Sequence, residues 1–219
     1  MKLLPELLKI YLVIFTCQLL TPAYAGSYKD FFTFIDADRA QEIEILLNKG
    51  FDPNTVNEEG VPALILAAQK KSFNAIVVLV KHKKTNLNVV SKEFENTLML
   101  AAIQNQIEIA KLLIEQGAEV NKPGWTPLHY AATKGYIDIM RLLIEHSAYL
   151  DAESPNGTTP LMMAAYYGTP QAVKLLLEEG ADPLIKNKLG LSAMDFAKQS
   201  THKDSQDYIQ AFVNAVTAR

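Results

Sequence analysis

The stretch that decides the fold is "GWTPLHYAATKG", from Gly124 to Gly135, because variants of it recur along the chain. "GTTPLMMAAYYG" begins 33 residues later at Gly157, and "GLSAMDFAKQS" begins a further 33 residues on at Gly190. Upstream, "ENTLMLAAIQN" and "GVPALILAAQK" carry the same apolar and alanine pattern from Glu95 and Gly60. A fixed spacing of this length indicates a repeat architecture.

Each copy contains the signals of a short helix. Thr126 is a good N-cap, and Pro127 suits the first helical position, where its missing N–H is not needed. Paired alanines such as Ala131 and Ala132 leave a thin face against which a neighbouring helix can pack closely. Glycine follows at Gly135 and Gly168, and Asn105 stands there in another copy; we expect these residues to be left-handed at the helix end.

A second apolar segment follows each copy, as in "RLLIEHSAYLD" (141–151) and "KLLLEEGADP" (174–183). The preceding residues from Ile137 extend the first of these into a helix that is apolar around most of its girth, which requires neighbours on both sides. Gly50, Gly117 and Gly180 are expected to close these second helices.

These motifs resemble the ankyrin-repeat family. The resemblance implies an all-α repeat solenoid of helix-turn-helix units joined by β-hairpin-like loops. It covers about six units: 28–59, 60–93, 94–123, 124–156, 157–189 and 190–219. We expect the repeat domain to occupy residues 26–219, with "SYKD" (27–30) disordered and an apolar stripe on a last helix, covered by polar residues, capping the C-terminal end.

Residues 1–25 are expected to be a secretory signal peptide. Lys2 and Lys9 precede the eleven-residue apolar run "IYLVIFTCQLL" (10–20), and Ala23 and Ala25 place a cleavage site between Ala25 and Gly26. The run is shorter than the roughly 20 residues that a membrane-spanning helix needs, although an uncleaved anchor is the alternative. The only cysteine, Cys17, would leave with this segment. We therefore expect a periplasmic or secreted protein with no membrane span after cleavage.

Composition excludes several classes of function. Of the 219 residues, 49% are hydrophobic and 21% are charged, and the net charge is −3. This balance is typical of an ordered domain and gives no basic face for nucleic acid. Four histidines without i, i+4 spacing, and no phosphate-binding or nucleophile motif, predict no metal, no cofactor and no catalytic residue. We therefore expect a protein without enzymatic activity.

His129 and Asp138 are interpreted as structural residues. The resemblance implies that a histidine at this position fixes the turn by hydrogen bonding. Met99, Met162 and Ile65 occupy the same position in other copies, so no shared catalytic chemistry is expected. Asp138 stands at the start of a helix, where an acid complements the macrodipole.

The resemblance also implies that another protein binds to the concave face made by first helices and hairpin loops. Mapping these positions onto the sequence gives nine candidate contact residues: Trp125, Tyr166, Tyr167, Thr133, Lys134, Thr158, Gln69, Lys70 and Gln104. The three aromatics are the expected centre, since exposed aromatics dominate many interfaces. The alternative is that Trp125 packs on a neighbouring loop and that one tyrosine covers a helix end.

Two units depart from the pattern. The step from the third to the fourth is 30 residues, so the loop "AEVNKPGW" (118–125) is expected to be short and to leave a notch beside Trp125. In the second unit, Pro62 replaces the capping threonine, and Lys71 and Lys83 replace the two glycines. We expect strained left-handed lysines there, and we expect this unit to open first in hydrogen exchange.

The expected function is that of an exported, monomeric scaffold that binds a protein partner. It would inhibit, or protect against, an envelope enzyme or toxin. The alternatives are a secreted effector that binds host proteins, an enzyme with a site in the groove, and an envelope scaffold with many weak partners.

Overall fold

The computed structural model describes residues 26–217, and the signal-peptide prediction with Ala25 and Cys17 lies outside them. Within this part, every regular element is a helix, and the loops carry only isolated antiparallel bridges. The fold is an all-α repeat solenoid, as predicted. The chain divides into two compact units between Lys84 and Thr85, and each is described by itself. These two units are larger than the single repeats, and we call them the first unit and the second unit.

The first unit contains a helix over residues 26–36, α2 (Ala40–Asn48), α3 (Ala63–Lys70) and α4 (Phe73–Lys81). Its core is apolar, with Phe31, Ile35, Ile43 and Leu79 fully buried. The predicted disorder of residues 27–30 is wrong, because these residues are helical and the hydroxyl of Tyr28 donates a hydrogen bond to the Val56 carbonyl at 2.9 Å.

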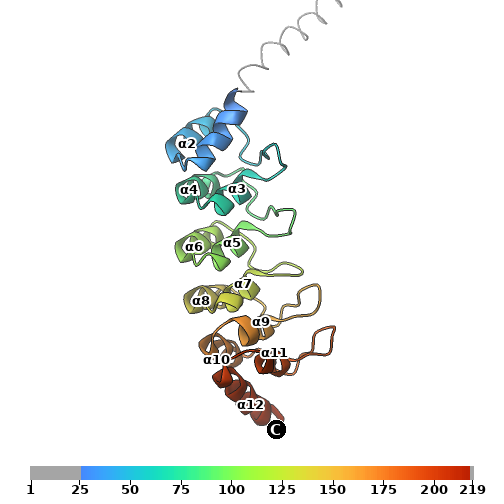
Figure 1. Ribbon diagram of the computed structural model, residues 1–219. Helices are drawn as coiled ribbons and strands as arrows, with labels where there is room; N and C mark the ends of the chain where they lie inside the picture. The colour runs from blue at the N-terminus through green and yellow to red at the C-terminus, as the bar shows by residue number, and fades with distance from the viewer. Residues whose placement is uncertain (1–25, 218–219) are drawn as a thin grey trace, which may run out of the picture. The chain divides into compact units, whose positions relative to one another are not determined.

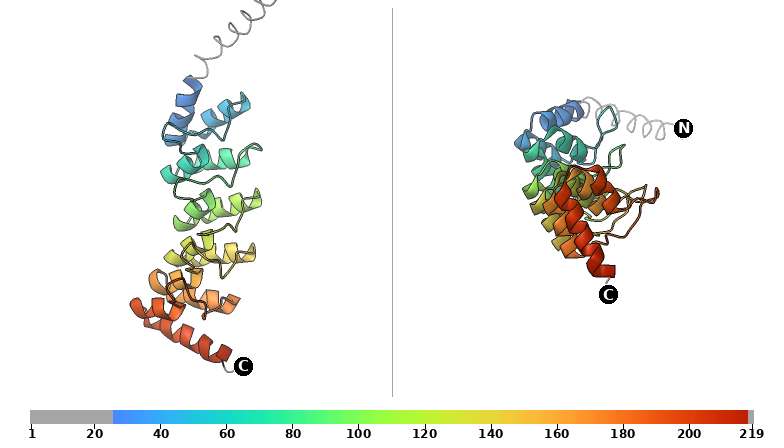
Figure 2. Two further views of the ribbon diagram at one scale, coloured as in Figure 1. Left: turned by 90° about the vertical axis from the view of Figure 1, so that its right-hand side faces the viewer. Right: turned by 60° about the horizontal axis from the view of Figure 1, so that its bottom comes forward.

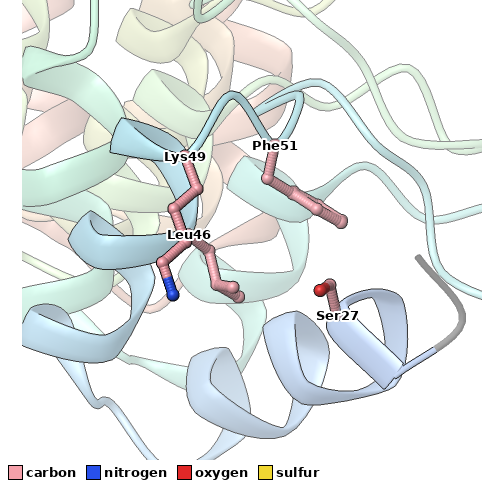
Figure 3. Close-up of a pocket in the computed structure, with 4 residues that line it drawn as sticks. All are labelled: Ser27, Leu46, Lys49 and Phe51. Carbon is pink, nitrogen blue, oxygen red and sulfur yellow. The ribbon is translucent and has the colours of Figure 1, made fainter. Parts of the chain in front are cut away.

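A small hollow lies beside this first helix. Figure 3 shows Ser27 facing Leu46 of α2, Lys49 just after the end of α2 and the ring of Phe51. Its volume is about 80 Å³, which is room for two or three water molecules at roughly 30 Å³ each. The hollow is therefore too small to serve as a ligand site.

Lys71 and Lys83, the two lysines that replace glycines of the repeat pattern, behave differently. Lys71 ends α3 in the left-handed conformation (φ 59°), as expected, and Pro62 provides no side-chain cap at the start of α3. The expectation for Lys83 is wrong. The chain leaves α4 through His82 in an extended conformation (φ −79°, ψ 122°), so no left-handed residue is needed.

The second unit stacks four helix pairs in order. The first helices of the pairs are α5 (Thr97–Ile103), α7 (Pro127–Lys134), α9 (Pro160–Tyr167) and α11 (Ala193–Gln199). The second helices are α6 (Ile107–Glu115), α8 (Ile137–Glu145), α10 (Pro170–Glu179) and α12 (Lys203–Thr217). Each helix packs on its counterpart in the next pair (Figures 1 and 2).

The predicted caps explain where the first helices begin. The side chains of Asn96, Thr159 and Ser192 accept hydrogen bonds from backbone N–H groups in the first turns of α5, α9 and α11, and Thr126 occupies the same position before α7. At the other end of the unit, α12 buries Ile209 and exposes Asp207, Gln210 and Asn214, as expected of a terminal cap.

Gly135 and Asn105 have the left-handed backbone conformation that the sequence predicts at the ends of the first helices, but Gly168 does not. Its φ is −82°, so it is glycine for a different reason. A Cβ atom at this position would lie 2.4 Å from the Ala132 carbonyl oxygen and 2.8 Å from the Ala164 carbonyl oxygen. Close packing of α9 against α7 therefore excludes any side chain here.

The loops that join successive pairs project from one side of the second unit, next to the first helices (Figures 1 and 2). We call these loops fingers. Finger 1 spans residues 88–96, finger 2 spans 119–126, finger 3 spans 151–159 and finger 4 spans 184–192. Fingers 1 and 4 each contain an antiparallel bridge, Val90 to Asn96 and Lys186 to Ser192, and finger 2 contains none.

Candidate functional site

Finger 2 is short, as the sequence predicts. The chain runs from Glu115 at the end of α6 to Pro127 at the start of α7, whereas the next connection runs from Glu145 to Pro160. An open hollow of about 690 Å³ lies beside this short finger and is lined by residues of all four fingers. We call it the Trp125 hollow. Its lining residues are Glu93, Phe94, Lys122, Pro123, Gly124, Trp125, Glu153, Ser154, Pro155 and Lys188.

Pro155 keeps fingers 2 and 3 from pairing across this hollow. Between fingers 3 and 4, the Lys188 N–H donates to the Asn156 carbonyl at 3.0 Å. The residue of finger 3 that corresponds to Lys188 is Pro155, which has no N–H to donate. The Pro123 carbonyl, which corresponds to that of Asn156, instead accepts from the Lys122 ammonium at 3.1 Å.

Lys122 stabilises the short finger from within. Its ammonium also donates to the Trp125 carbonyl at 3.2 Å, so one side chain bridges both ends of the turn around Gly124. Partial burial lowers the pKa of Lys122. Gly124 has a φ of 81°, which is the left-handed conformation that glycine adopts at little cost.

The first wall of the hollow carries an unusual residue, Phe94. It stands where the other fingers and the first unit have Gly60, Gly124, Gly157 and Gly190, all with φ between 76° and 81°. Phe94 is left-handed at φ 63°, and its side chain is 72% exposed. A left-handed conformation costs a non-glycine residue roughly 1–2 kcal/mol. Sequence analysis did not single out Phe94, although aligning the hairpin glycines would have found it.

Finger 1 is held rigidly despite this strain. The buried Ser91 hydroxyl accepts hydrogen bonds from the backbone N–H groups of Glu93 and Glu95, and the Phe94 N–H donates to the Ser91 carbonyl at 3.0 Å. The Tyr130 hydroxyl of α7 donates to the Glu95 carboxylate at 2.8 Å, which ties the finger to the helix. Burial, followed by this bond to Glu95, raises the pKa of Tyr130.

Trp125 lies between two hollows. On the helix side it lines a smaller one of about 210 Å³ with Ile103, His129, Tyr130, Thr133 and Met163. Its ring meets the His129 ring edge-on, with centroids 5.1 Å apart. The half-buried indole is therefore held in place while part of its surface remains open.

His129 is structural, as the sequence indicates. The Thr126 N–H donates to Nδ1 of His129 at 3.2 Å, so Nε2 carries the proton and donates to the Thr158 carbonyl at 2.9 Å. The side chain thus caps α7 and attaches it to finger 3. Burial lowers the pKa of His129 from 6.5 to about 4.

The methionines at the equivalent positions share part of this role. The Asn96 and Thr159 N–H groups donate to the sulfurs of Met99 and Met162, each at 3.5 Å. Only His129 has a second polar atom that reaches the next finger. Among the described residues, no cluster of three or more metal-ligating side chains occurs.

The structure separates the candidate contact residues into groups. Gln69 and Lys70 are exposed in the first unit. In the second unit, Trp125 and Thr133 share the smaller hollow, Lys134 is exposed and Gln104 is half-buried. Tyr166 contacts Tyr167 and Phe196 instead, with centroids 4.4 Å and 6.3 Å apart.

The structure corrects one candidate, Thr158, and shows how the three aromatic candidates are arranged. The Thr158 side chain is 2% exposed, because finger 3 folds over it and the Ser154 hydroxyl accepts its N–H, so Thr158 offers no contact surface. The three aromatics do not form one ring cluster, since Trp125 packs on His129 and the two tyrosines pack on each other at the end of α9; their role as contact residues stays a prediction. Tyr167 is the exposed member of that pair, at 60%.

Comparison with known proteins agrees with this architecture. A family model described as ankyrin repeats in three copies matches residues 35–124 and again 98–187. The chain is 31% identical to the nuclear factor NF-kappa-B p105 subunit of Gallus gallus over 156 residues, covering 68% of this chain and 16% of the relative. It is 26% identical to the transient receptor potential cation channel subfamily A member 1 of Homo sapiens over 165 residues, covering 69% of this chain and 15% of the relative.

The chain thus spans less than a fifth of these curated relatives. Among solved structures, an ankyrin repeat domain from Acinetobacter baumannii AYE aligns with a TM-score of 0.75 at 22% identity, covering 84% of this chain and 97% of that one. The human ASB11 ankyrin repeat domain aligns with a TM-score of 0.72 at 21% identity, covering 83% and 82%. The family match extends over more than half of the chain, so this protein belongs to the ankyrin-repeat family.

Proposed function

We propose that this protein is an exported, non-enzymatic binding protein and that its binding site is centred on the Trp125 hollow. Ankyrin repeats generally mediate protein–protein interaction, which supports the class of function. The N-terminal pattern of residues 1–25 supports export to the periplasm or the medium. No described helix is long and apolar enough to span a membrane.

The observation that carries the proposed site is the combination of a shortened finger with two large aromatics at the gap. Trp125 lines the hollow from finger 2, and Phe94 lines it from finger 1 with 72% of its surface exposed. Aromatic residues in preformed concave sites are the usual centre of a protein interface. Because the fingers are already ordered by internal hydrogen bonds, little conformational entropy is lost on binding.

Within this class, we propose a monomer that inhibits, or protects against, one envelope enzyme or toxin. A secreted effector that binds host proteins is the second candidate, favoured by the similarity to chains from animals. Cell fractionation distinguishes the two, because a protective protein stays in the envelope and an effector reaches the medium.

The test is affinity capture from envelope extract with three baits: the unchanged protein, Trp125→Ala and the matched control Tyr167→Ala. Circular dichroism first establishes that both variants fold. The proposal expects one stoichiometric protein that the control retains and Trp125→Ala loses. Equal capture by all three baits would place the site elsewhere, and loss only with Tyr167→Ala would move it to the end of α9.

A further inference from the structure

The Trp125 hollow has a charge pattern that indicates what its occupant carries. Glu93 on finger 1 and Glu153 on finger 3 line opposite walls, and both are exposed. Among the described residues, neither side chain takes part in a salt bridge. Each carboxylate is therefore free to pair with a cation that enters the hollow.

The two lysines at the hollow are already engaged. The Lys122 ammonium donates to the Pro123 and Trp125 carbonyls at 3.1 and 3.2 Å, and the Lys188 ammonium donates to the Pro155 carbonyl at 2.8 Å. Both ammonium groups keep their positive charge, but these bonds hold them against the backbone carbonyls of fingers 2 and 3, whereas no salt bridge within residues 26–217 engages the Glu93 and Glu153 carboxylates. The two carboxylates are therefore the charged groups of the hollow that the finger backbone does not already hold.

Phe94 adds a second, independent indication. Its left-handed backbone is strained, and its exposed ring contributes little to the core, so fold stability does not explain the residue. Strain of this kind concentrates at functional sites. The Phe94 and Trp125 rings border the same hollow, and aromatic faces attract ammonium and guanidinium groups.

The shape of the hollow favours an extended occupant. Finger 2 lacks the bridge found in fingers 1 and 4, and Pro155 prevents finger 3 from pairing with it. Finger 2 is also shorter than finger 3, and a hollow bordered by narrow loops suits an extended stretch of chain better than a helix about 10–12 Å across.

We propose that the Trp125 hollow receives an extended segment of the partner protein, and that an arginine or lysine of that segment lies against Phe94 and Trp125 with its charge facing Glu93 and Glu153. This inference rests on the proposed function, and it adds the chemistry of the partner to it. It makes Phe94 a binding residue whose strained conformation is retained for recognition.

The test uses a displayed library of random linear twelve-residue peptides, selected on the purified full-length protein. Enriched peptides are then synthesised, and their binding to variants is measured by titration at low salt. We expect arginine or lysine next to an apolar residue in the enriched peptides. We expect Trp125→Ala to weaken their binding tenfold or more, and Glu93→Gln combined with Glu153→Gln to weaken it roughly three- to tenfold.

Two controls separate binding from folding. Glu108→Gln combined with Glu145→Gln removes two exposed carboxylates from the second helices and should change binding less than twofold. Phe94→Gly should weaken peptide binding about tenfold while its urea midpoint stays the same or rises, a combination that a merely structural role would not produce.

Each other outcome contradicts a definite part of the account. One such outcome is peptides that bind through Trp125 yet lack basic residues, and another is peptides that bind the Glu93→Gln/Glu153→Gln variant as tightly as the unchanged protein. Either result would contradict a basic partner segment but would still support the Trp125 hollow as the binding site. Peptides that bind Trp125→Ala and Phe94→Gly unchanged would overturn both the inference and the site. Enrichment of no peptide at all would overturn the extended segment, because a preformed hollow should bind it without the rest of the partner.

Discussion

Acidification should destabilise the protein through His129. Burial lowers its pKa from 6.5 to about 4, so between these values the unfolded chain takes up a proton that the folded chain does not. Stability is therefore fully present above pH 6.5, falls as the pH drops and has lost this contribution below pH 4. The difference in pKa corresponds to roughly 3 kcal/mol in total, and about 2 kcal/mol of it is lost by pH 5.

The variant His129→Met isolates this effect. Methionine at the same position in α5 and α9 already caps those helices through its sulfur. In α7 it would remove the bond from Nε2 and leave the buried Thr158 carbonyl without its partner, at a cost of about 1–3 kcal/mol near neutral pH. Because methionine has no titratable group, the variant would also lose the pH dependence that arises from His129.

Urea unfolding of both proteins at a series of pH values between 7.5 and 4.5 measures the difference. We expect the variant to be less stable at pH 7.5 and the gap to close, or reverse, at pH 4.5. Other groups that titrate in this range are common to both proteins, so they cancel in the comparison. A gap that stays constant over the whole range would refute the buried, neutral His129.

Three further changes test individual backbone positions. Phe94→Gly should leave unfolding free energy unchanged or raise it by up to about 1 kcal/mol, because the relief of strain offsets the loss of a mostly exposed ring, and a clear loss in urea unfolding would contradict this. Lys71→Gly should stabilise the protein by about 1 kcal/mol, because glycine adopts the left-handed conformation at the end of α3 without strain. It should also slow amide exchange in α3, where we expect the earliest opening. Uniform amide protection along the unchanged protein would contradict that early opening. Gly168→Ala should destabilise by about 2 kcal/mol or more, since its Cβ would collide with the Ala132 and Ala164 carbonyls, and a thermal midpoint within one degree of the parent would disprove that packing.

Local signals predicted the parts of the fold that depend on local chemistry. Thr126 and Pro127 mark the start of α7 because capping and a fixed φ act within one turn. The short finger could be counted from the spacing, because a loop that lacks three residues cannot reach as far as its neighbours. Asn105 and Lys71 were found because they occupy positions where glycine is otherwise left-handed.

The misses depend on contacts between distant segments. Gly168 is required by the approach of a carbonyl 36 residues earlier, which no local pattern reveals. Thr158 follows a hairpin glycine, as Trp125 does, yet the bonds of finger 3 bury it. Phe94 is a different case. Its position, which is that of the hairpin glycine, can be read from the repeat, but its left-handed backbone and its exposed ring are seen only in the structure.

The most direct test of the central claim is photo-crosslinking in the producing cell. A benzophenone amino acid replaces Phe94 at the hollow or, as the control, the exposed Glu108 on α6. The account predicts that light produces one discrete heavier species from position 94 and none from position 108, and that Trp125→Ala abolishes it. If position 94 yields no species, or both positions yield the same one, the hollow is not where this protein meets its partner.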